Sequence, residues 1–303
     1  MIDPNVRAKV ERPAGVRSCR GKWLLAVSLL LLLGACRSEE TSQAQAPDAA
    51  RLDAEHDEPV TEAAPDTDGS TVIDGGNGMV LMPEGYAIDA TEVTRAAYAA
   101  WLEAKPPADG QPKYCEWNTT FEPDAECMAS EYVCKTDCDQ HPQVCLDWCD
   151  AHAYCKANGK RLCGKIGGGS LPWNERPKPT LGQWINACTS HGQHEYPYGD
   201  APALGEASTG GRCNDGSLNT ENTTPVGSMP ACQASGTYAG VFDLSGNVAE
   251  WIDACETYEG FLDACSEIGG SWPGGTYHAQ CSSLGDSARH RVHEAIGFRC
   301  CSE

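Results

Sequence analysis

Cysteine is the feature that most constrains this chain, because sixteen of its eighteen cysteines follow residue 79, in a stretch of about 225 residues. An even number of cysteines in an exported protein indicates a disulfide framework, here of up to eight bridges, whose connectivity the sequence leaves open. A zinc site is the rival interpretation, since the pairs Cys134 and Cys138, and Cys145 and Cys149, have spacing loosely like that of zinc ligands. Disulfides are favoured over metal outside the cytosol.

The N-terminus predicts export. Basic residues precede an apolar run over 23–33, which at about 11 residues is too short to span a bilayer and is typical of a signal-peptide core. Two small residues stand directly before Cys36, as in a bacterial lipoprotein signal; an ordinary secretory signal with a chance cysteine is the alternative. We expect residues 1–36 to be a lipoprotein signal peptide and Cys36 to be the lipid anchor to the membrane. Arg37, where a retention acid would otherwise stand, favours the outer membrane of the cell envelope.

The next segment, over 37–78, is rich in Ala, Asp, Glu, Pro and Thr and contains no aromatic residue. Such a composition buries too little apolar surface to offset the entropy of ordering, so we expect a disordered acidic tether. The whole chain has a formal net charge of −21. A chain this acidic is a poor partner for nucleic acid or an anionic bilayer surface, which leaves cations or an unidentified protein or peptide ligand.

The remaining residues, 79–303, are expected to form one domain. Short strands are predicted over 79–83 and 86–89, and a helix over 95–104 with Thr94 as its N-cap. Residues from about 106 to 143 are dense in Pro, Asp and Cys without apolar periodicity, which predicts a cross-linked surface insertion. A second helix is expected over 144–157.

Five blocks follow one another in a distinctive order. They are Ala90-Thr91-Glu92-Val93-Thr94 with Tyr98; Val144, Trp148 and Tyr154-Cys155 with Gly159-Lys160-Arg161-Leu162; the stretch from Gly240 to Trp251; Gly269-Gly270-Ser271-Trp272; and Gly297-Phe298-Arg299-Cys300. With these blocks, 79–301 resembles the formylglycine-generating enzyme, or sulfatase-modifying factor, family. The resemblance implies a loop-rich, disulfide-rich α+β fold related to C-type lectin-like domains, with little regular secondary structure.

In catalytic members of that family a pair of cysteines shortly after the Gly-Gly-Ser block binds Cu(I) and oxidises a substrate cysteine to formylglycine. Soft thiolates suit a cuprous ion. The matching positions in this chain hold Gly274 and Ala279, and Cys281 lies two positions beyond the second. Copper binding is therefore not expected, and the domain is interpreted as a non-catalytic binding or structural module.

Two enzymatic alternatives stay open. One is a formylglycine-generating-type oxidase whose site is rearranged around Cys281. The other is a metal-dependent oxidase that uses imidazoles, for which His278, His290 and His293 are the candidates. A free thiol at Cys281 would favour the first alternative, and a shared metal site for the three histidines would favour the second.

Calcium is the cofactor that the resemblance implies. The stretch from 240 to 251 would supply hard oxygen ligands on a tight turn, which is what calcium requires. The matching ligands are the side chains of Asp243 and Glu250 and the backbone carbonyls of Gly246 and Val248, with Asn214 in a further site. The competing interpretation is that Asp243 and Asn247 only stabilise turns.

Overall fold

The computed structural model describes residues 72–73, 78–200, 212–216 and 221–303. The predicted signal peptide, Cys36 and most of the predicted tether lie outside these residues. Strand β1 (Val72–Ile73) pairs with strand β2 (Met79–Leu81), so regular structure begins before the boundary predicted at residue 79. None of the helices described is long and apolar enough to cross a membrane.

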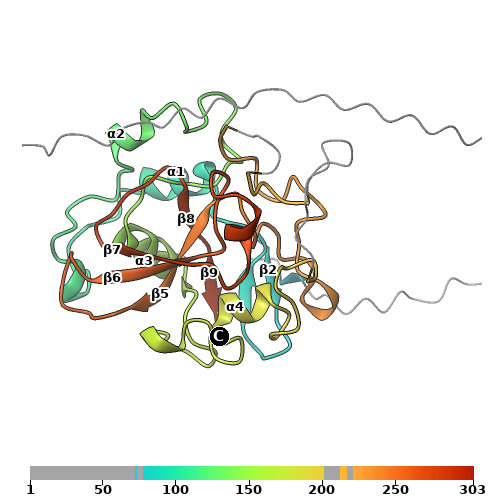
Figure 1. Ribbon diagram of the computed structural model, residues 1–303. Helices are drawn as coiled ribbons and strands as arrows, with labels where there is room; N and C mark the ends of the chain where they lie inside the picture. The colour runs from blue at the N-terminus through green and yellow to red at the C-terminus, as the bar shows by residue number, and fades with distance from the viewer. Residues whose placement is uncertain (1–71, 74–77, 201–211, 217–220) are drawn as a thin grey trace, which may run out of the picture. The chain divides into compact units, whose positions relative to one another are not determined.

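A five-stranded antiparallel sheet joins the two ends of the domain (Figure 1). Its order is β1-β2-β3-β9-β4, where β3 is Ala87–Asp89, β9 is Cys300–Ser302 and β4 is Arg161–Leu162. Strands β2 and β3 confirm the two strands predicted from the sequence. The C-terminal strand lies between β3 and β4, with Cys301 opposite Ile88 and Cys300 opposite Leu162.

A second sheet has four strands in the order β7-β6-β5-β8. The strands are β5 (Ala249–Cys255), β6 (Ala264–Ile268), β7 (Leu284–Ala288) and β8 (Ile296–Phe298). Strand β5 is antiparallel to β6 and parallel to β8, with Trp251 opposite Phe298. Most residues of β5 are buried on both faces, as expected for a central strand packed on two sides. The predicted α+β class is confirmed.

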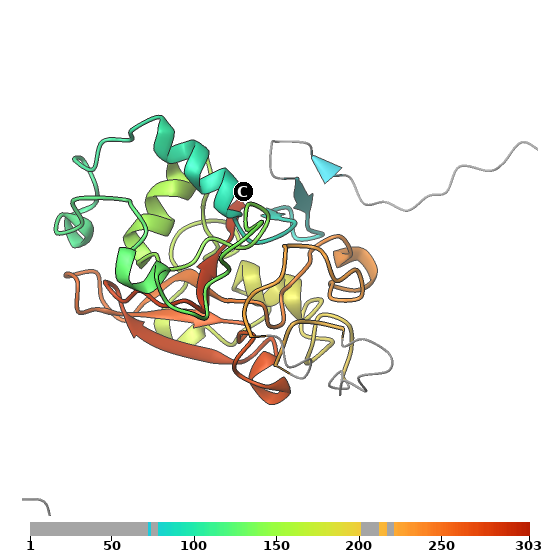
Figure 2. The same cartoon turned by 90° about the horizontal axis from the view of Figure 1, so that it is seen from above.

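Helices α1 (Arg95–Glu103) and α3 (Trp148–Ala157) lie side by side in both views (Figures 1 and 2). Tyr98 of α1 stacks on Tyr154 of α3, with ring centroids 5.4 Å apart. The predicted N-cap of α1 is confirmed, because the side chain of Thr94 accepts the backbone N–H of Ala97 at 3.1 Å.

Helix α3 begins four residues later than the sequence predicts. Asp147 is its N-cap and forms a capping box with Asp150, in which each carboxylate accepts the backbone N–H of the other residue, at 2.9 and 3.1 Å. Residue Cys145 instead donates its N–H to the carbonyl of His293 at 3.1 Å, which holds the chain outside the helix. The helix start is therefore set by the capping box rather than by the apolar periodicity.

The remaining helices are short. They are α2 (Ala125–Met128), α4 (Gln183–Cys188) and the 3-10 helices η1 (Lys113–Cys115), η2 (Trp173–Glu175), η3 (Gly236–Tyr238) and η4 (Thr276–Ala279). As predicted, the insertion over 106–143 is cross-linked: its disulfides are Cys115–Cys149, Cys127–Cys145 and Cys134–Cys138. The zinc interpretation fails because all four cysteines that it requires are in disulfides.

Every cysteine in the described part of the chain is paired, in eight disulfides, as the even count allows. The other five are Cys155–Cys300, Cys163–Cys301, Cys188–Cys281, Cys213–Cys232 and Cys255–Cys265. The bridges from β9 close segments with separations of 145 and 138 residues. In the chain-entropy description each such bridge stabilises the fold by about 5 kcal/mol.

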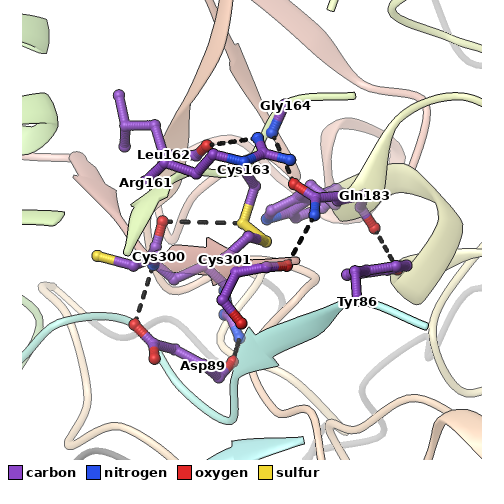
Figure 3. The surroundings of a disulfide bond; sticks show 12 residues. Tyr86, Asp89, Arg161, Leu162, Cys163, Gly164, Gln183, Cys300 and Cys301 are labelled. Carbon is purple, nitrogen blue, oxygen red and sulfur yellow. Dashed lines mark hydrogen bonds between the residues drawn. A yellow bond between two sulfur atoms is a disulfide. The ribbon is translucent and has the colours of Figure 1, made fainter. Parts of the chain in front are cut away.

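Strand β9 is also held by side chains that surround the Cys163–Cys301 bridge (Figure 3). The Gln183 amide donates to the carbonyl of Ser302 at 3.1 Å and accepts the N–H of Gly164 at the same distance. Asp89 accepts the backbone N–H of Cys300 at 2.9 Å. The C-terminal block is thereby fixed in the centre of the domain, which positions Arg299 next to the predicted calcium loop.

Candidate functional site

The loop from Gly240 to Val248 forms a tight turn that leads into β5. Asp243, Gly246 and Asn247 all have left-handed backbones, with φ of 57°, 78° and 56°. Asn and Asp tolerate this region better than other residues with a side chain, whereas Gly246 is required for a second reason. A Cβ on Gly246 would lie 2.3 Å from the carbonyl oxygen of Asn214, so the two segments approach too closely for any side chain.

Glu250 binds an arginine. Arg299 donates to both carboxylate oxygens of Glu250, from Nη2 at 2.8 Å and from Nε at 2.8 and 3.0 Å, and both side chains are fully buried. The indole N–H of Trp184 donates to the same carboxylate at 2.9 Å. The donors around Glu250 are thus supplied by the protein itself.

Two further carboxylates lie close to Arg299. Glu92 Oε2 is 4.0 Å from Arg299 Nη2, and Glu92 Oε1 accepts the amide N–H of Asn247 at 2.9 Å. Asp243 accepts the backbone N–H of Gly227 at 2.5 Å. Burial raises the pKa of Glu92 well above its ordinary value and raises the pKa of Asp243 to about 6. We call Glu92, Asp243, Glu250 and Arg299 the buried ionic cluster.

The predicted calcium ligands do not fit calcium as a set. Glu250, which should be one of the two side-chain ligands, directs both oxygens at Arg299 and Trp184. Asp243 lies in the same cluster, on the loop that carries Gly246 and Val248. Asn214, which was predicted for a further site, accepts the backbone N–H of Asn247 at its own backbone carbonyl, at 2.7 Å. Within the described ranges, no group of three His, Cys, Asp or Glu side chains has the arrangement of a metal site.

A surface groove lies beside this cluster. It has a volume of ≈ 740 Å³ and is lined by Glu131, Tyr132, Gly216, Glu221, Trp272, Pro273, Gly274 and Gly275. Its lining combines two aromatic rings and two carboxylates with glycine backbone, and no described Lys, Arg or His side chain lines it. We call it the Trp272 groove. Its composition suits a ligand that carries positive charge and a flat or apolar part.

The walls of the groove come from segments far apart in the sequence. The N–H of Trp272 donates to the carbonyl of Asn247 at 3.1 Å, which ties the groove to the loop of the buried ionic cluster. A Cβ on Gly216 would lie 2.7 Å from the carbonyl oxygen of Trp272, so glycine permits this close approach. Tyr132 also lines the groove and packs beside Trp272, with the ring centroids 6.0 Å apart and the two rings inclined at 35°.

The indole of Trp272 is 8 % exposed, and no acceptor among the described residues lies within hydrogen-bond distance of its Nε1. Buried polar groups are rarely left without a partner, and such exceptions occur at functional sites more often than in a core that serves stability alone. This observation adds to the case for the groove as the functional site.

The resemblance matches Gly274 and Ala279 to the copper thiolates. Gly274 lines the Trp272 groove, whereas Ala279 is completely buried and its carbonyl accepts the hydroxyl of Ser245 at 2.6 Å. Cys281, the cysteine of the oxidase alternative, is buried and bonded to Cys188 of α4. Neither matching position therefore carries a thiol, and the nearby thiol is oxidised.

The three histidines of the second alternative do not form a metal site among the described residues. His290 packs against the rings of Trp117 and Phe261, and its Nδ1 lies 2.8 Å from the carbonyl oxygen of Phe261. His278 lies in η4 beside Gly274. Nδ1 of His293 accepts the backbone N–H of Ala295 at 3.1 Å.

Sequence reasoning missed most of the groove. Glu131 and Tyr132 lie in the cysteine-rich insertion, and Glu221 lies in a polar segment, where neither periodicity nor a motif distinguishes them. Trp272 is the last residue of the Gly269-Gly270-Ser271-Trp272 block, and no pattern in the sequence indicates a function for its side chain. The adjacent acid and tyrosine in a cross-linked loop were the one available signal, since a large ring held by disulfides in an exposed segment is a common binding element.

Comparison with known proteins identifies the family of this domain. Residues 59–303 match the sulfatase-modifying factor enzyme 1-like domain. The serine/threonine-protein kinase pkn1 of Chlamydia caviae is 28% identical over 180 residues, which are 53% of this chain and 24% of that protein, so this chain spans about a quarter of that relative. The crystal structure of CarF is 21% identical with a TM-score of 0.46, over 72% of this chain and 85% of that one. The structure of PvdO from Pseudomonas aeruginosa is 18% identical with a TM-score of 0.48, over 78% and 88%. On the match over 59–303, which contains both sheets, the buried ionic cluster and the Trp272 groove, the chain belongs to the sulfatase-modifying factor enzyme 1-like family.

Proposed function

We propose that this protein is a non-catalytic binding module that uses the Trp272 groove. The observation that carries the proposal is the Cys188–Cys281 disulfide, because it removes the one thiol near the positions of the copper ligands. Copper-dependent cysteine oxidation needs a pair of thiolates, which are the soft ligands that Cu(I) prefers. Gly274 and Ala279 have no thiol, and a cysteine in a disulfide supplies no thiolate.

The groove supports binding rather than a purely structural role. A structural module needs no cavity of ≈ 740 Å³ at the position of the family's reaction centre. Where catalytic members carry the first copper thiolate, Gly274 contributes only backbone to the lining. A binding module needs a cavity but no reactive thiol, and the Trp272 groove meets both conditions.

The proposed location is the cell envelope, with a lipid anchor at Cys36 and an acidic tether over 37–78. The eight disulfides support export, because such bridges form and persist in oxidising compartments. The proposed partner is a protein or peptide rather than nucleic acid, in keeping with the net charge of −21.

Three measurements on the oxidised, folded protein test the absence of catalysis. Thiol titration in denaturant without reductant should detect no thiol from the domain, and competition with a Cu(I) chelator should show no tight copper binding. A cysteine-containing sulfatase-type peptide incubated with the protein, Cu(I) and oxygen should keep its mass. Conversion of the peptide cysteine to formylglycine, lost on Cys281→Ser, would instead support the formylglycine-generating-type oxidase with a rearranged site.

A further inference from the structure

We propose that a second pocket, where α1 and α3 lie side by side (Figure 2), binds a carboxylic acid with an apolar or aromatic body. The pocket has a volume of ≈ 280 Å³ and is lined by Trp101 of α1, by Phe121, by one face of α3 and by residues between 106 and 112. We call it the Trp101 pocket. It shares no lining residue with the Trp272 groove, so the proposal does not depend on the function proposed for that groove.

Small residues on α3 and two aromatic rings build the apolar part of the pocket. Ala153 and Ala157 are one helical turn apart and both line the pocket, where longer side chains would fill it. The rings of Trp101 and Phe121 pack against each other with centroids 5.1 Å apart, so a ligand lies against this pair rather than between the rings. The apolar lining is completed by three prolines, which are Pro106, Pro107 and Pro112.

The polar part of the pocket offers hydrogen-bond donors. His152 and Lys156 are also one turn apart on α3, and both line the pocket. Among the described residues, no carboxylate forms an ion pair with the Lys156 ammonium, and the indole N–H of Trp101 has no acceptor. Burial lowers the pKa of His152, so at about pH 7 its imidazole is neutral and can donate one hydrogen bond. A carboxylate, which accepts hydrogen bonds and is negatively charged, matches these groups.

The charges of the lining favour an acid over an amine. With His152 neutral, the charged lining residues are Lys156 and Asp109. Asp109 is exposed, so water and salt screen its charge, and within the described ranges it forms no ion pair. An amine in the pocket would instead lie beside the Lys156 ammonium and meet the donor N–H of Trp101. A free aromatic acid and the C-terminal residue of a peptide share the favoured chemistry.

The wall of the pocket between residues 106 and 112 is held in place before a ligand arrives. The amide of Gln111 donates to the carbonyl of Ala108 at 3.0 Å and to that of Asn118 at 2.6 Å, which closes this segment on itself. The Cys115–Cys149 disulfide then ties it to α3. The prolines of the wall add stiffness, because their φ is fixed. A pocket that is already formed loses little entropy on binding, which favours a small ligand.

The test is titration of the oxidised, folded protein with phenylpropionate, followed by the NMR linewidths of the ligand. The Kd should be on the order of 1 mM or below. Lys156→Met keeps the length of the side chain but removes its charge, and should weaken binding about tenfold. Lys113→Met is the matched control, because Lys113 is exposed and does not line the pocket, and should change the affinity by less than about twofold. Phenylpropanamide, which has the same shape without the charge, should bind the wild type about tenfold more weakly and should not respond to Lys156→Met.

Two variants test the location. Ala153→Leu should fill the pocket and abolish binding, with circular dichroism as the check that the domain is folded. If that variant does not fold, Ala157→Leu, at an exposed lining position near the end of α3, replaces it. Phenylpropionate binding that survives in the folded variant would overturn the proposal.

The charge and the source of the ligand are tested separately. Equal affinity for phenylpropionate and its amide, tighter binding of phenylethylamine, or an equal loss in Lys156→Met and Lys113→Met would each overturn the proposal. A peptide of three glycines that ends in phenylalanine distinguishes the two sources. Binding of its free-carboxylate form identifies a chain terminus as the ligand, and binding of phenylpropionate alone identifies a small acid; both results support the proposed site.

Discussion

Arg299 spans the three carboxylates of the buried ionic cluster, and its closest partner is Glu250, whose two oxygens it contacts from Nη2 and Nε at 2.8 Å. Neither side chain is exposed to more than 1%. The arginine of the Gly297-to-Cys300 block thus joins β5, the turn at Asp243 and the segment at Glu92. It makes the closing block of the sequence a structural partner of the loop that resembles a calcium site.

Replacement of Arg299 is expected to destabilise the domain strongly. Arg299→Met leaves three buried carboxylates without their cation, which should lower the free energy of unfolding by about 3–5 kcal/mol. Urea denaturation followed by tryptophan fluorescence measures this. Arg291→Met is the control, because Arg291 is exposed, and should change stability by less than about 0.5 kcal/mol. Similar losses in both variants would contradict the role of Arg299.

Calcium is expected to leave the thermal stability unchanged. Glu250 binds Arg299, so Glu250→Gln should lower the Tm by the same amount in calcium and in chelator. Thermal unfolding of the wild type and Glu250→Gln under both conditions is the measurement. A calcium-dependent rise of the wild-type Tm that Asp243→Ala abolishes would instead support the calcium site expected from the resemblance, because a ligand stabilises only the state that binds it.

Stability should fall as the pH rises from about 4, where these carboxyls titrate in the unfolded chain, to about 7. Burial raises the pKa of Asp243 and of Asp147 to about 6, and that of Glu267 to about 7. A carboxyl whose pKa is higher in the folded than in the unfolded state stabilises the fold while protonated. This contribution is complete below the unfolded pKa and is lost as pH rises through the folded value.

Asp243→Asn tests this pH dependence. Asparagine keeps an acceptor for the N–H of Gly227 and tolerates the positive φ, but it does not titrate. Urea midpoints of both proteins at pH values below and above 6 should therefore show a shallower decline for the variant. A wild-type curve that instead rises with pH across this range would contradict the raised pKa values.

Disulfides that close long segments should contribute more to the free energy of unfolding than disulfides that close short ones. Removal of the Cys163–Cys301 bridge by a double Cys→Ala substitution opens a separation of 138 residues and should cost about 5 kcal/mol. Removal of Cys134–Cys138, with a separation of 4, should cost about 2 kcal/mol. Urea denaturation of both oxidised variants gives the comparison, and a larger loss for the short loop would contradict the entropic account.

Cys36→Ser tests the lipid anchor, which lies outside the described residues. The variant should be released from the membrane or remain unprocessed, because the thiol that accepts the lipid is absent. Fractionation of cells and mass spectrometry of the N-terminus measure this, with Cys19→Ser as the control within the leader. Unchanged retention of Cys36→Ser in the outer membrane would contradict the predicted lipoprotein signal.

Local chemistry was predictable from the sequence. The even number of cysteines predicted a disulfide framework, the Thr94 side chain predicted the start of α1, and the five ordered blocks led to the family over 59–303. These signals depend on neighbouring residues or on composition, which the chain carries before it folds. The start of α3 was predicted too early because apolar spacing does not reveal which acid becomes the cap.

Only the tertiary structure decided which residues meet. It pairs Cys281 with Cys188 rather than leaving a thiol, turns Glu250 toward Arg299 rather than toward a cation, and brings Tyr132 to Trp272 across most of the domain. Each contact joins segments far apart in the chain, so its formation depends on the packing of both sheets rather than on local preference. The identities of these residues were visible in the sequence, but their partners, and therefore their chemistry, were set by long-range contacts.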